Sequence, residues 1–299
     1  MKNILFVKYL NSIYNDIYMK IKNILLSSDD NTKYISFWPT AAYHWQSLGY
    51  NVYLALLTNK PDNCEFINKI KEHGTNVFVF KPSEKYNLMI QSKLLRYYIS
   101  KFFFDDICCI HDIDFYTLDN HKHAEDMVTD EILNNNKIAT LGYNAYLNYH
   151  GFNIENVKKN QVYRVPATPL ISKGINIYSI FNNSQNCDFN IFLDNLNIYY
   201  QNLKKENSDE SILYYFMSKN IDWAKNNIIF NVRNDFKDSN GNWCMYANKR
   251  IDRGKKCHFD MTKFKNGYYI DLCPSRPYDK NEIEYLLDYL KIPKELQNL

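Results

Sequence analysis

The sequence predicts an α/β fold with a mixed, mostly parallel central sheet flanked by helices, followed by a less regular C-terminal region. Three observations predict it. Short apolar runs alternate with helical stretches over the first 120 residues, as in chains of β-α-β units. The runs lack polar alternation, which is typical of strands buried on both faces. Pro39 stands at one expected helix start, and Gly49 and Gly74 follow two expected helix ends.

These patterns give an order of elements. In the first half we expect strands at 3–9, 51–57, 76–80 and 107–110, and helices at 40–48, 64–73 and 86–101. Further on we expect helices at 121–133, 208–218 and 281–290, and strands at 137–143, 161–165, 227–232 and 267–272. No linker rich in Gly, Pro or Ser separates the halves. We therefore expect one domain over 1–299, with subregions 1–120 and 121–299.

Composition excludes several classes of protein. The 299 residues are 45% hydrophobic and 23% charged, which excludes a disordered or low-complexity chain. No apolar run approaches the roughly 18 residues that span a bilayer, and the apolar stretch Ile4–Val7 is too short for a signal peptide. The net charge is only +3, and the Lys and Arg residues are scattered along the chain rather than clustered. We therefore expect no nucleic-acid partner.

The seven cysteines are an odd number without a Cys-x-x-Cys pair, which favours reduced thiols. We therefore expect a cytoplasmic protein, either free or peripheral at a membrane. The histidines also suggest no metal site by their spacing, being scattered at positions 44, 73, 121, 123 and 150.

The motif Asp112-Ile113-Asp114 directly follows the apolar run 107–110. Ligands of α/β sheets bind at the carboxyl ends of the strands. Two carboxylates there can face one oxygen-preferring cation, Mn²⁺ or Mg²⁺. The alternative is a solvated turn with two acidic residues, and the spacing alone does not decide between them.

The order of motifs over most of the chain resembles GT-A fold glycosyltransferases, which use nucleotide-sugar donors. The similar stretches are short: NILFVKY at 3–9, WPTAAYHWQSLGYNVYL at 38–54, the helix carrying Lys93 and Arg96, the Asp-x-Asp motif, Ser208-Asp209-Glu210, and IDLCPSRP at 270–277. The resemblance implies a GT-A-like fold, with 1–120 binding the nucleotide-sugar and 121–299 binding the acceptor and closing the site.

The resemblance also implies roles for individual residues. The donor would contact Tyr9, Thr58, Lys93, Arg96, Asp112, Ile113, Asp114 and Arg276. Asp112 and Asp114 would hold Mn²⁺ or Mg²⁺. Many family members place a His ligand in the C-terminal loop where this chain has Cys273, so His258 is the substitute third ligand.

The implied reaction moves a sugar from a nucleoside-diphosphate sugar to a glycan, a glycoconjugate or another hydroxyl acceptor. If it inverts the anomeric centre, a carboxylate base is needed. Asp209 is favoured over Glu210 because a helix start often projects such a group into a cleft. The alternative for this pair is a helix cap that interacts with the helix dipole.

Two rival functions remain. A haloacid-dehalogenase-like phosphatase also has Asp-x-Asp after an apolar strand, but near the start of the chain and followed by Thr or Val where this chain has Tyr116. A non-catalytic carbohydrate-binding protein with a degenerate transferase fold would show no Mn²⁺-dependent thermal shift with any nucleoside diphosphate.

Overall fold

The computed structural model describes residues 20–74, 76–134, 137–141, 168–181, 187–200, 209–219, 228–231, 250–252, 260–274, 284 and 287–296. The first-half elements are β1 (Asn23–Asp29), α2 (Thr32–Ile35), α3 (Trp38–Ser47), β2 (Asn51–Leu57), α4 (Glu65–His73), β3 (Val77–Phe80), α5 (Leu88–Ile99), the 3₁₀ helix η1 (Ser100–Phe103), β4 (Ile107–Ile110) and β5 (Tyr116–Thr117). The later ones are α6 (Lys122–Glu125), α7 (Asp130–Asn134), β6 (Ile138–Leu141), β7 (Leu170–Lys173), α9 (Gly174–Ser179), α10 (Phe189–Tyr200), α11 (Asp209–Lys219), β8 (Ile228–Asn231), β9 (Arg250–Asp252), α13 (Met261–Lys265) and β10 (Asp271–Cys273).

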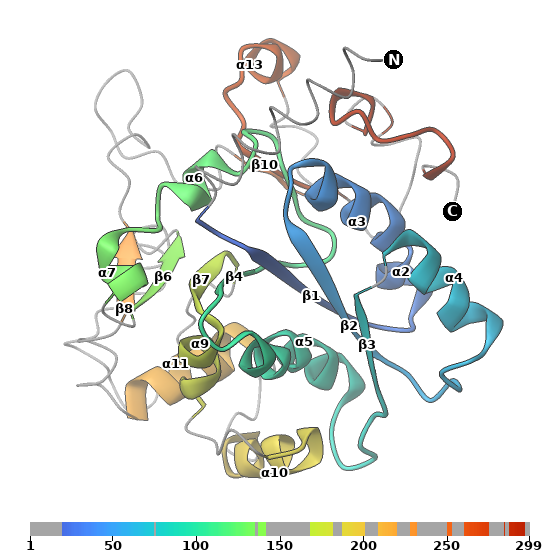
Figure 1. Cartoon of the computed structure of the whole chain (residues 1–299), viewed down its shortest axis with the longest axis vertical. Coiled ribbons are helices and arrows are strands. Elements are labelled where there is room, and N and C mark those ends of the chain that lie inside the picture. The colour runs from blue at the N-terminus through green and yellow to red at the C-terminus, as the bar shows by residue number, and fades with distance from the viewer. Residues whose placement is uncertain are drawn as a thin grey trace.

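The main sheet has the strand order β3-β2-β1-β4-β7-β6-β8 (Figure 1). The pairs β1–β2, β2–β3, β1–β4 and β6–β8 are parallel, and β7 is antiparallel to both of its neighbours. The predicted mixed, mostly parallel sheet flanked by helices is thus confirmed. A second sheet, β5-β10-β9, joins the short strand after β4 to the C-terminal part of the chain.

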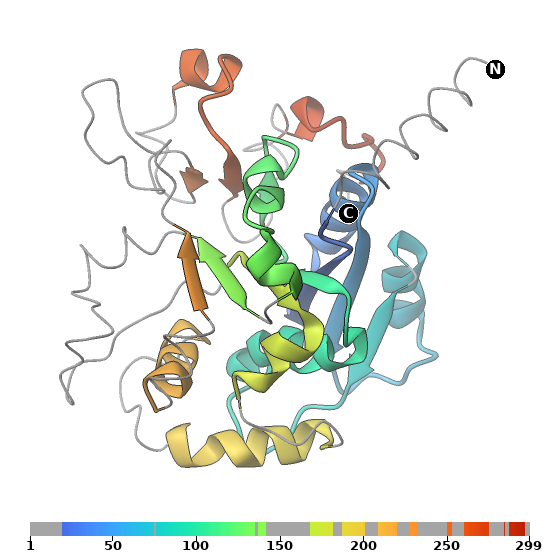
Figure 2. The same ribbon diagram turned by 60° about the vertical axis from the view of Figure 1, so that its left-hand side comes forward.

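The sheet is buried on both faces, and its side chains alternate between two cores. Ile24, Val52 and Cys109 pack with α3 and α4 on one face. Leu25 and Cys108 pack with α5, α9, α10 and α11 on the other face. Figures 1 and 2 show these helix groups on opposite sides of β1 and β2. We call these the α3 face and the α5 face. Burial on both faces explains why the apolar runs lack polar alternation.

The first strand of the sheet differs from the expected one. The run 3–9 lies outside the described residues. The strand between β2 and β4 is β1, Asn23–Asp29, for which the sequence pattern predicted no strand. The predicted strands β2, β3 and β4 and the helices α3, α4 and α5 are confirmed to within two residues at each end, with η1 as the last turn of the predicted helix 86–101.

The second half follows the prediction less closely. The expected helix 121–133 is two short helices, α6 and α7, and the expected strand 267–272 is the shorter β10. The helix at 208–218 and the strands at 137–143 and 227–232 correspond to α11, β6 and β8. The expected strand 161–165 lies outside the described residues. Half of the expected helix 281–290 lies outside them too, and residues 284 and 287–289 are helical as expected. The helices α9 and α10 and the strand β7 were not predicted.

The start of α5 is fixed by two side chains. Asn87 caps the helix by accepting a hydrogen bond from the backbone N–H of Met89 at 3.0 Å. The fully buried amide of Gln91 accepts from the N–H of Ser83 and donates to the carbonyls of Ser83 and Tyr86, each at 2.8 Å. The loop that leads into α5 is therefore held through its backbone.

Helix α9 packs closely on η1. Its first residue, Gly174, donates its N–H to the carbonyl of Asp106 at 3.1 Å. A Cβ atom at this position would lie 2.2 Å from the carbonyl oxygen of Ser100. Only glycine permits this approach. Among the described helices, none has both the length and the apolar character needed to cross a bilayer.

Candidate functional site

The strand order marks one place on the sheet for a ligand. The chain winds from β1 through β2 to β3 on one side of β1, whereas β4 lies on its other side. Ligands of such sheets bind beyond the carboxyl ends of the strands where the winding direction switches, here between β1 and β4. Asp29 ends β1, Thr58 follows β2, and Asp112 lies just after β4. These residues therefore share one edge of the sheet.

The end of β1 contributes two carboxylates that the sequence analysis missed. Asp29 is buried, and burial raises the pKa of its carboxyl group. The hydroxyl of Thr58 donates to Asp30 Oδ2 at 2.6 Å, which joins the ends of β1 and β2. The signal that could have found them is the polar run Ser27–Asn31, which follows the apolar residues 24–26.

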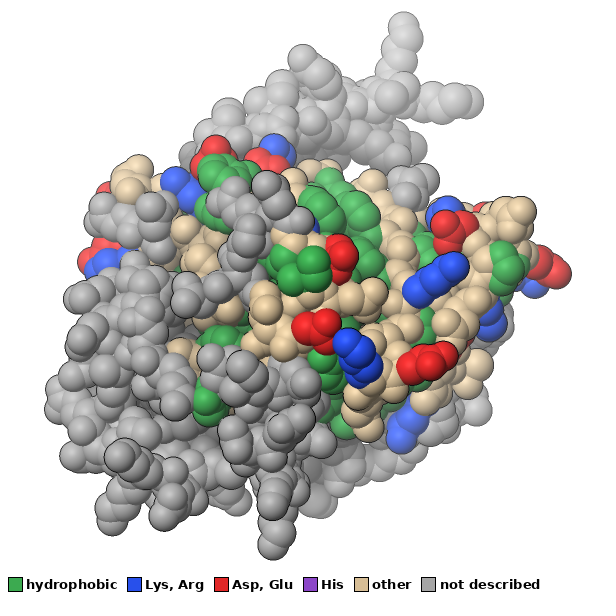
Figure 3. All heavy atoms as spheres, turned by 90° about the horizontal axis from the view of Figure 1, so that it is seen from below, with side chains coloured by type: hydrophobic (Ala, Val, Ile, Leu, Met, Phe, Trp, Pro, Cys, Tyr) green, Lys and Arg blue, Asp and Glu red, His purple; other side chains and the backbone are tan. Residues whose placement is uncertain are grey.

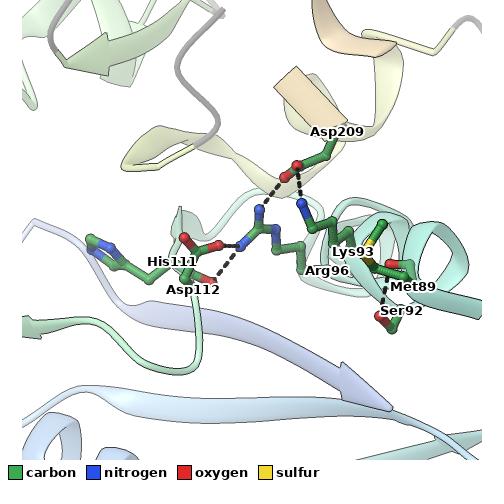
Figure 4. Close-up of polar contacts among 7 residues, drawn as sticks. All are labelled: Met89, Ser92, Lys93, Arg96, His111, Asp112 and Asp209. Carbon is green, nitrogen blue, oxygen red and sulfur yellow. Dashed lines mark hydrogen bonds and ion pairs between the residues drawn. The ribbon is translucent and has the colours of Figure 1, made fainter. Parts of the chain in front are cut away.

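Four charged side chains meet beside the end of β4 (Figure 4). Arg96, from α5, donates to Asp112 Oδ1 at 2.5 Å and to the carbonyl of His111 at 2.9 Å. Its other terminal nitrogen donates to Asp209, the first residue of α11, and Lys93 contacts Asp209 Oδ1 at 3.1 Å. We call Lys93, Arg96, Asp112 and Asp209 the ionic cluster. Lys93 and Arg96 lie three residues apart on one face of α5, and this face approaches Asp112.

The side chains of the ionic cluster differ in solvent exposure. The side chains of Arg96 and Asp209 are 3% and 5% exposed, whereas those of Asp112 and Lys93 are 32% and 37% exposed. Burial would lower the pKa of Arg96, but Asp112, Tyr97 and Asp209 outweigh it, and this pKa lies well above the usual value. Arg96 is therefore a fixed cation, and Asp112 and Lys93 are the members that a ligand can reach.

Two expectations need correction. Asp112 and Asp114 were both expected to face a cation beyond the strand end, but Asp114 is fully buried, and Ile113 is 3% exposed. The loop turns back toward the core after Asp112, since Phe115 and Tyr116 are buried as well. Asp209 was expected to project into a cleft, but its carboxylate is buried against two cations. Glu210, beside it on α11, is only half-buried.

Three predicted site residues, Tyr9, His258 and Arg276, lie outside the described residues. Cys273, expected in a closing loop, is buried at the end of β10. Its strand neighbour Asp271 is fully buried. This part of the expected loop is therefore a strand of the second sheet, paired with β5 and β9.

The chemistry of the donor set fits a hard divalent cation. Carboxylate oxygens are the ligands that Mg²⁺ and Mn²⁺ prefer, and Asp112 offers such a group at the accessible edge of the ionic cluster. A different set of ligands lies on the α3 face. There, within the described part of the chain, Cys109, His111 and His121 bring their metal-binding atoms within 4.8 Å of one another.

Figure 3 shows how charge is spread over one face of the molecule. On this face, acidic and basic side chains of the described residues are interspersed.

Comparison of the sequence with models of protein families and with curated proteins finds no match. Comparison with solved structures finds similar folds among glycosyltransferases. A galactosyltransferase, LgtC, in complex with donor and acceptor sugar analogues is 12% identical, with a TM-score of 0.48 over 91% of this chain and 98% of that chain.

The glycosyltransferase GlyE of Streptococcus pneumoniae is 13% identical, with a TM-score of 0.46 over 93% of this chain and 63% of that one. The bifunctional glycosyltransferase WbbM is 10% identical, with a TM-score of 0.46 over 93% of this chain and 51% of that one.

Proposed function

We propose that this chain is a metal-dependent, inverting glycosyltransferase that moves a sugar from a nucleoside-diphosphate sugar to a glycan or another hydroxyl acceptor. The observation that carries the proposal is the ionic cluster at the switch point of the sheet. It combines an accessible carboxylate, a buried arginine and a half-exposed lysine at the edge where α/β sheets bind nucleotides.

The leaving group of this reaction explains why such a cluster is useful. Breaking the glycosidic bond of the donor releases a diphosphate that carries additional negative charge. Positive groups held in place before the reaction stabilise that charge without reorganising. Asp112, with His258 as a further assigned ligand, would hold Mn²⁺ or Mg²⁺, and the bound cation would supply Lewis-acid stabilisation of the diphosphate.

The residues of the cluster divide the work. Arg96 fixes the carboxylate of Asp112 through a short charge-assisted hydrogen bond, and Asp209 fixes Arg96 from its other side. Lys93 has a flexible stem and is 37% exposed, so it can turn from Asp209 to a phosphate oxygen. Asp29, Asp30 and Thr58, at the ends of β1 and β2, would contact the nucleoside of the donor, with Tyr9, Ile113 and Arg276 as further donor contacts.

The base for an inverting reaction must reach the acceptor hydroxyl. Asp209 is buried and engaged with two cations, so we assign it to positioning Arg96 and Lys93. Glu210, half-buried at the same helix start, is the carboxylate of the pair that we assign as base. Replacing Glu210 with Gln should lower turnover by about 10²- to 10⁴-fold while leaving donor affinity unchanged. Near-normal turnover in this variant would remove Glu210 from the mechanism.

A thermal-shift panel tests the donor class directly. UDP-, GDP-, CMP- and dTDP-sugars are each added with and without Mn²⁺. A ligand at a hundredfold excess over its Kd stabilises the folded chain by about 2.7 kcal/mol, which shows as a clear rise in Tm. We expect a Mn²⁺-dependent rise with at least one donor, and its loss in Asp112→Asn.

The matched control is Asp105→Asn, which removes an exposed carboxylate near the opposite end of β4. This variant should keep the Mn²⁺-dependent rise. No rise with any donor in the unmodified chain would contradict the proposal and favour a protein without nucleotide-sugar chemistry.

A further inference from the structure

The strand β4 and the residues after it send alternate side chains to opposite faces of the sheet. Cys108 and Ile110 pack on the α5 face, where Asp112 also meets Arg96. Cys109 packs on the α3 face, and His111 stacks there on Trp45 with ring centroids 4.8 Å apart. This alternation with period two brings Cys109 and His111 to one side of the strand.

A third side chain returns to the same place. His121 precedes α6, and its Nε2 lies 2.9 Å from His111 Nε2 and 3.9 Å from Cys109 Sγ. Asn120 and His121 both have positive φ angles, 56° and 62°, which are uncommon for residues other than glycine. The hydroxyl of Thr117 accepts a hydrogen bond from the His121 N–H at 3.0 Å and holds this turn. Unfavourable backbone conformations of this kind cluster at functional sites.

We propose that Cys109, His111 and His121 bind one zinc ion, separate from the cation assigned to Asp112. One thiolate and two imidazole nitrogens are a ligand set that zinc accepts, whereas Mg²⁺ and Mn²⁺ prefer oxygen. Zinc bonds of about 2.3 Å to sulfur and about 2.05 Å to nitrogen, at tetrahedral angles, separate ligand atoms by roughly 3.4 to 3.6 Å. The distances of 2.9 and 3.9 Å therefore need changes of about half an ångström. The third pair, Cys109 and His111, lies within 4.8 Å and needs a change of at most about 1.2 Å.

The surroundings suit a buried cation. The S–H bond of Cys109 breaks as the zinc–sulfur bond forms, and the proton leaves to solvent. Zinc with one thiolate keeps one positive charge. An acidic side chain lies behind the histidines, since Tyr50 packs on His121 and donates its hydroxyl to Glu125 Oε1 at 2.9 Å. The rings of Trp45, Tyr50 and Phe115 close the site around the histidines.

The place of this site in the chain gives the ion a structural role. Its ligands flank residues 112–120, so zinc would fix both ends of the loop that begins with Asp112. The proposal does not depend on sugar transfer, because metal content is measured without a donor. Since all three ligands are buried, the ion would enter as the chain folds.

The experiment measures zinc in the full chain purified from zinc-supplemented medium and dialysed against a weak chelator. We expect stoichiometric zinc in the unmodified protein and background zinc in Cys109→Ser and His121→Gln. Cys108→Ser is the matched control, since this neighbour packs on the opposite face, and Asp112→Asn should also keep its zinc. Equal zinc in Cys109→Ser and in the unmodified protein would overturn the proposal.

A second measurement keeps the test decisive if the variants do not fold. The unmodified chain is unfolded with a strong chelator and refolded with Co²⁺. A thiolate-to-cobalt charge-transfer band in the near ultraviolet supports the site. Absence of both this band and zinc would mean that the two histidines form only a hydrogen-bonded pair in the core, and would overturn the proposal.

Discussion

On the α5 face of the sheet, the buried polar chemistry is ionic, with Arg96 held between Asp112 and Asp209. On the α3 face, the buried polar groups include His44, His111 and His121 among aromatic rings. Both sets lie next to β4, and the consecutive residues His111 and Asp112 belong to different sets. The difference teaches that one strand end can support two kinds of ligand chemistry, because alternate side chains enter separate cores.

The largest loss of stability should come from breaking the ion pairs of the ionic cluster. Arg96→Leu leaves the buried carboxylate of Asp209 with Lys93 as its remaining cation in the ionic cluster, so we expect a loss of about 3 to 5 kcal/mol in the free energy of unfolding. Chemical denaturation measures it. The double variant Arg96→Leu, Asp209→Leu should recover part of the loss, since it removes both charges. Lys22→Met, which breaks the exposed pair with Asp106, is the control and should be silent.

A second prediction probes the packing that supports the α5 face. Gly174→Ala places a methyl group 2.2 Å from the carbonyl oxygen of Ser100, so α9 or η1 must shift. We expect a loss of about 1 to 3 kcal/mol, the usual cost of overpacking. Thermal unfolding measures it, and an unchanged Tm would mean that α9 moves away from η1 without cost.

A buried histidine on the α3 face should make the stability of the fold depend on pH. Burial lowers the pKa of His44 from its ordinary 6.5 to about 3, and its Nε2 accepts a hydrogen bond from the Thr117 N–H at 3.1 Å. Between pH 6.5 and 3 the unfolded chain takes up a proton that the folded chain refuses. Stability should therefore fall as the pH drops through this window, by about 1.4 kcal/mol per pH unit from this residue.

His44→Gln tests this account, because it removes the titrating group and keeps a hydrogen-bond acceptor. Its stability should fall less steeply between pH 6 and pH 4 than that of the unmodified chain. His73→Gln, at the end of α4, is the matched control. Parallel slopes in all three proteins would contradict the assignment to His44.

The smallest effect concerns the buried hydroxyl of Thr40 on the α3 face. It donates to the carbonyl of Phe37 at 3.0 Å, and it lies 2.6 Å from the hydroxyl of Tyr116, which joins α3 to β5. Thr40→Val keeps the shape and removes both hydrogen bonds, so we expect a loss of about 1 to 2 kcal/mol. A loss of stability as large as that of Arg96→Leu would mean that uncharged hydrogen bonds on the α3 face matter as much as the ion pairs on the α5 face.

In the first half of the main sheet, sequence patterns predicted the strands that are apolar nearly throughout and missed β1, which is not. Val52–Leu57 and Ile107–Ile110 have nearly continuous apolar side chains. β1 is apolar only at Ile24–Leu26, and its second half is Ser-Ser-Asp. Ser28 is buried there, and its hydroxyl is satisfied because it donates to the carbonyl of Asp29 at 2.8 Å. Composition does not reveal such a local hydrogen bond.

The ionic cluster could be predicted only in part. The motif at Asp112 follows from its place after an apolar strand, and the resemblance to known enzymes pointed to Arg96 and Asp209. Their mutual contact joins residues 113 positions apart, which spacing cannot predict. The grouping of Cys109 and His111 with His121 was missed, because it depends on a turn with two positive φ angles.

Because the buried amide of Gln91 holds the loop before α5 by its backbone, the path of this loop depends little on the loop's own side chains. The hydrogen bonds of Gln91 go to backbone groups of Ser83 and Tyr86, so they do not depend on which side chains lie between these residues. Substitutions at positions 84 and 85 should therefore leave the path into α5 intact, whereas an insertion between 83 and 86 would disrupt it. This short segment can diverge in sequence without moving the helix that carries Lys93 and Arg96.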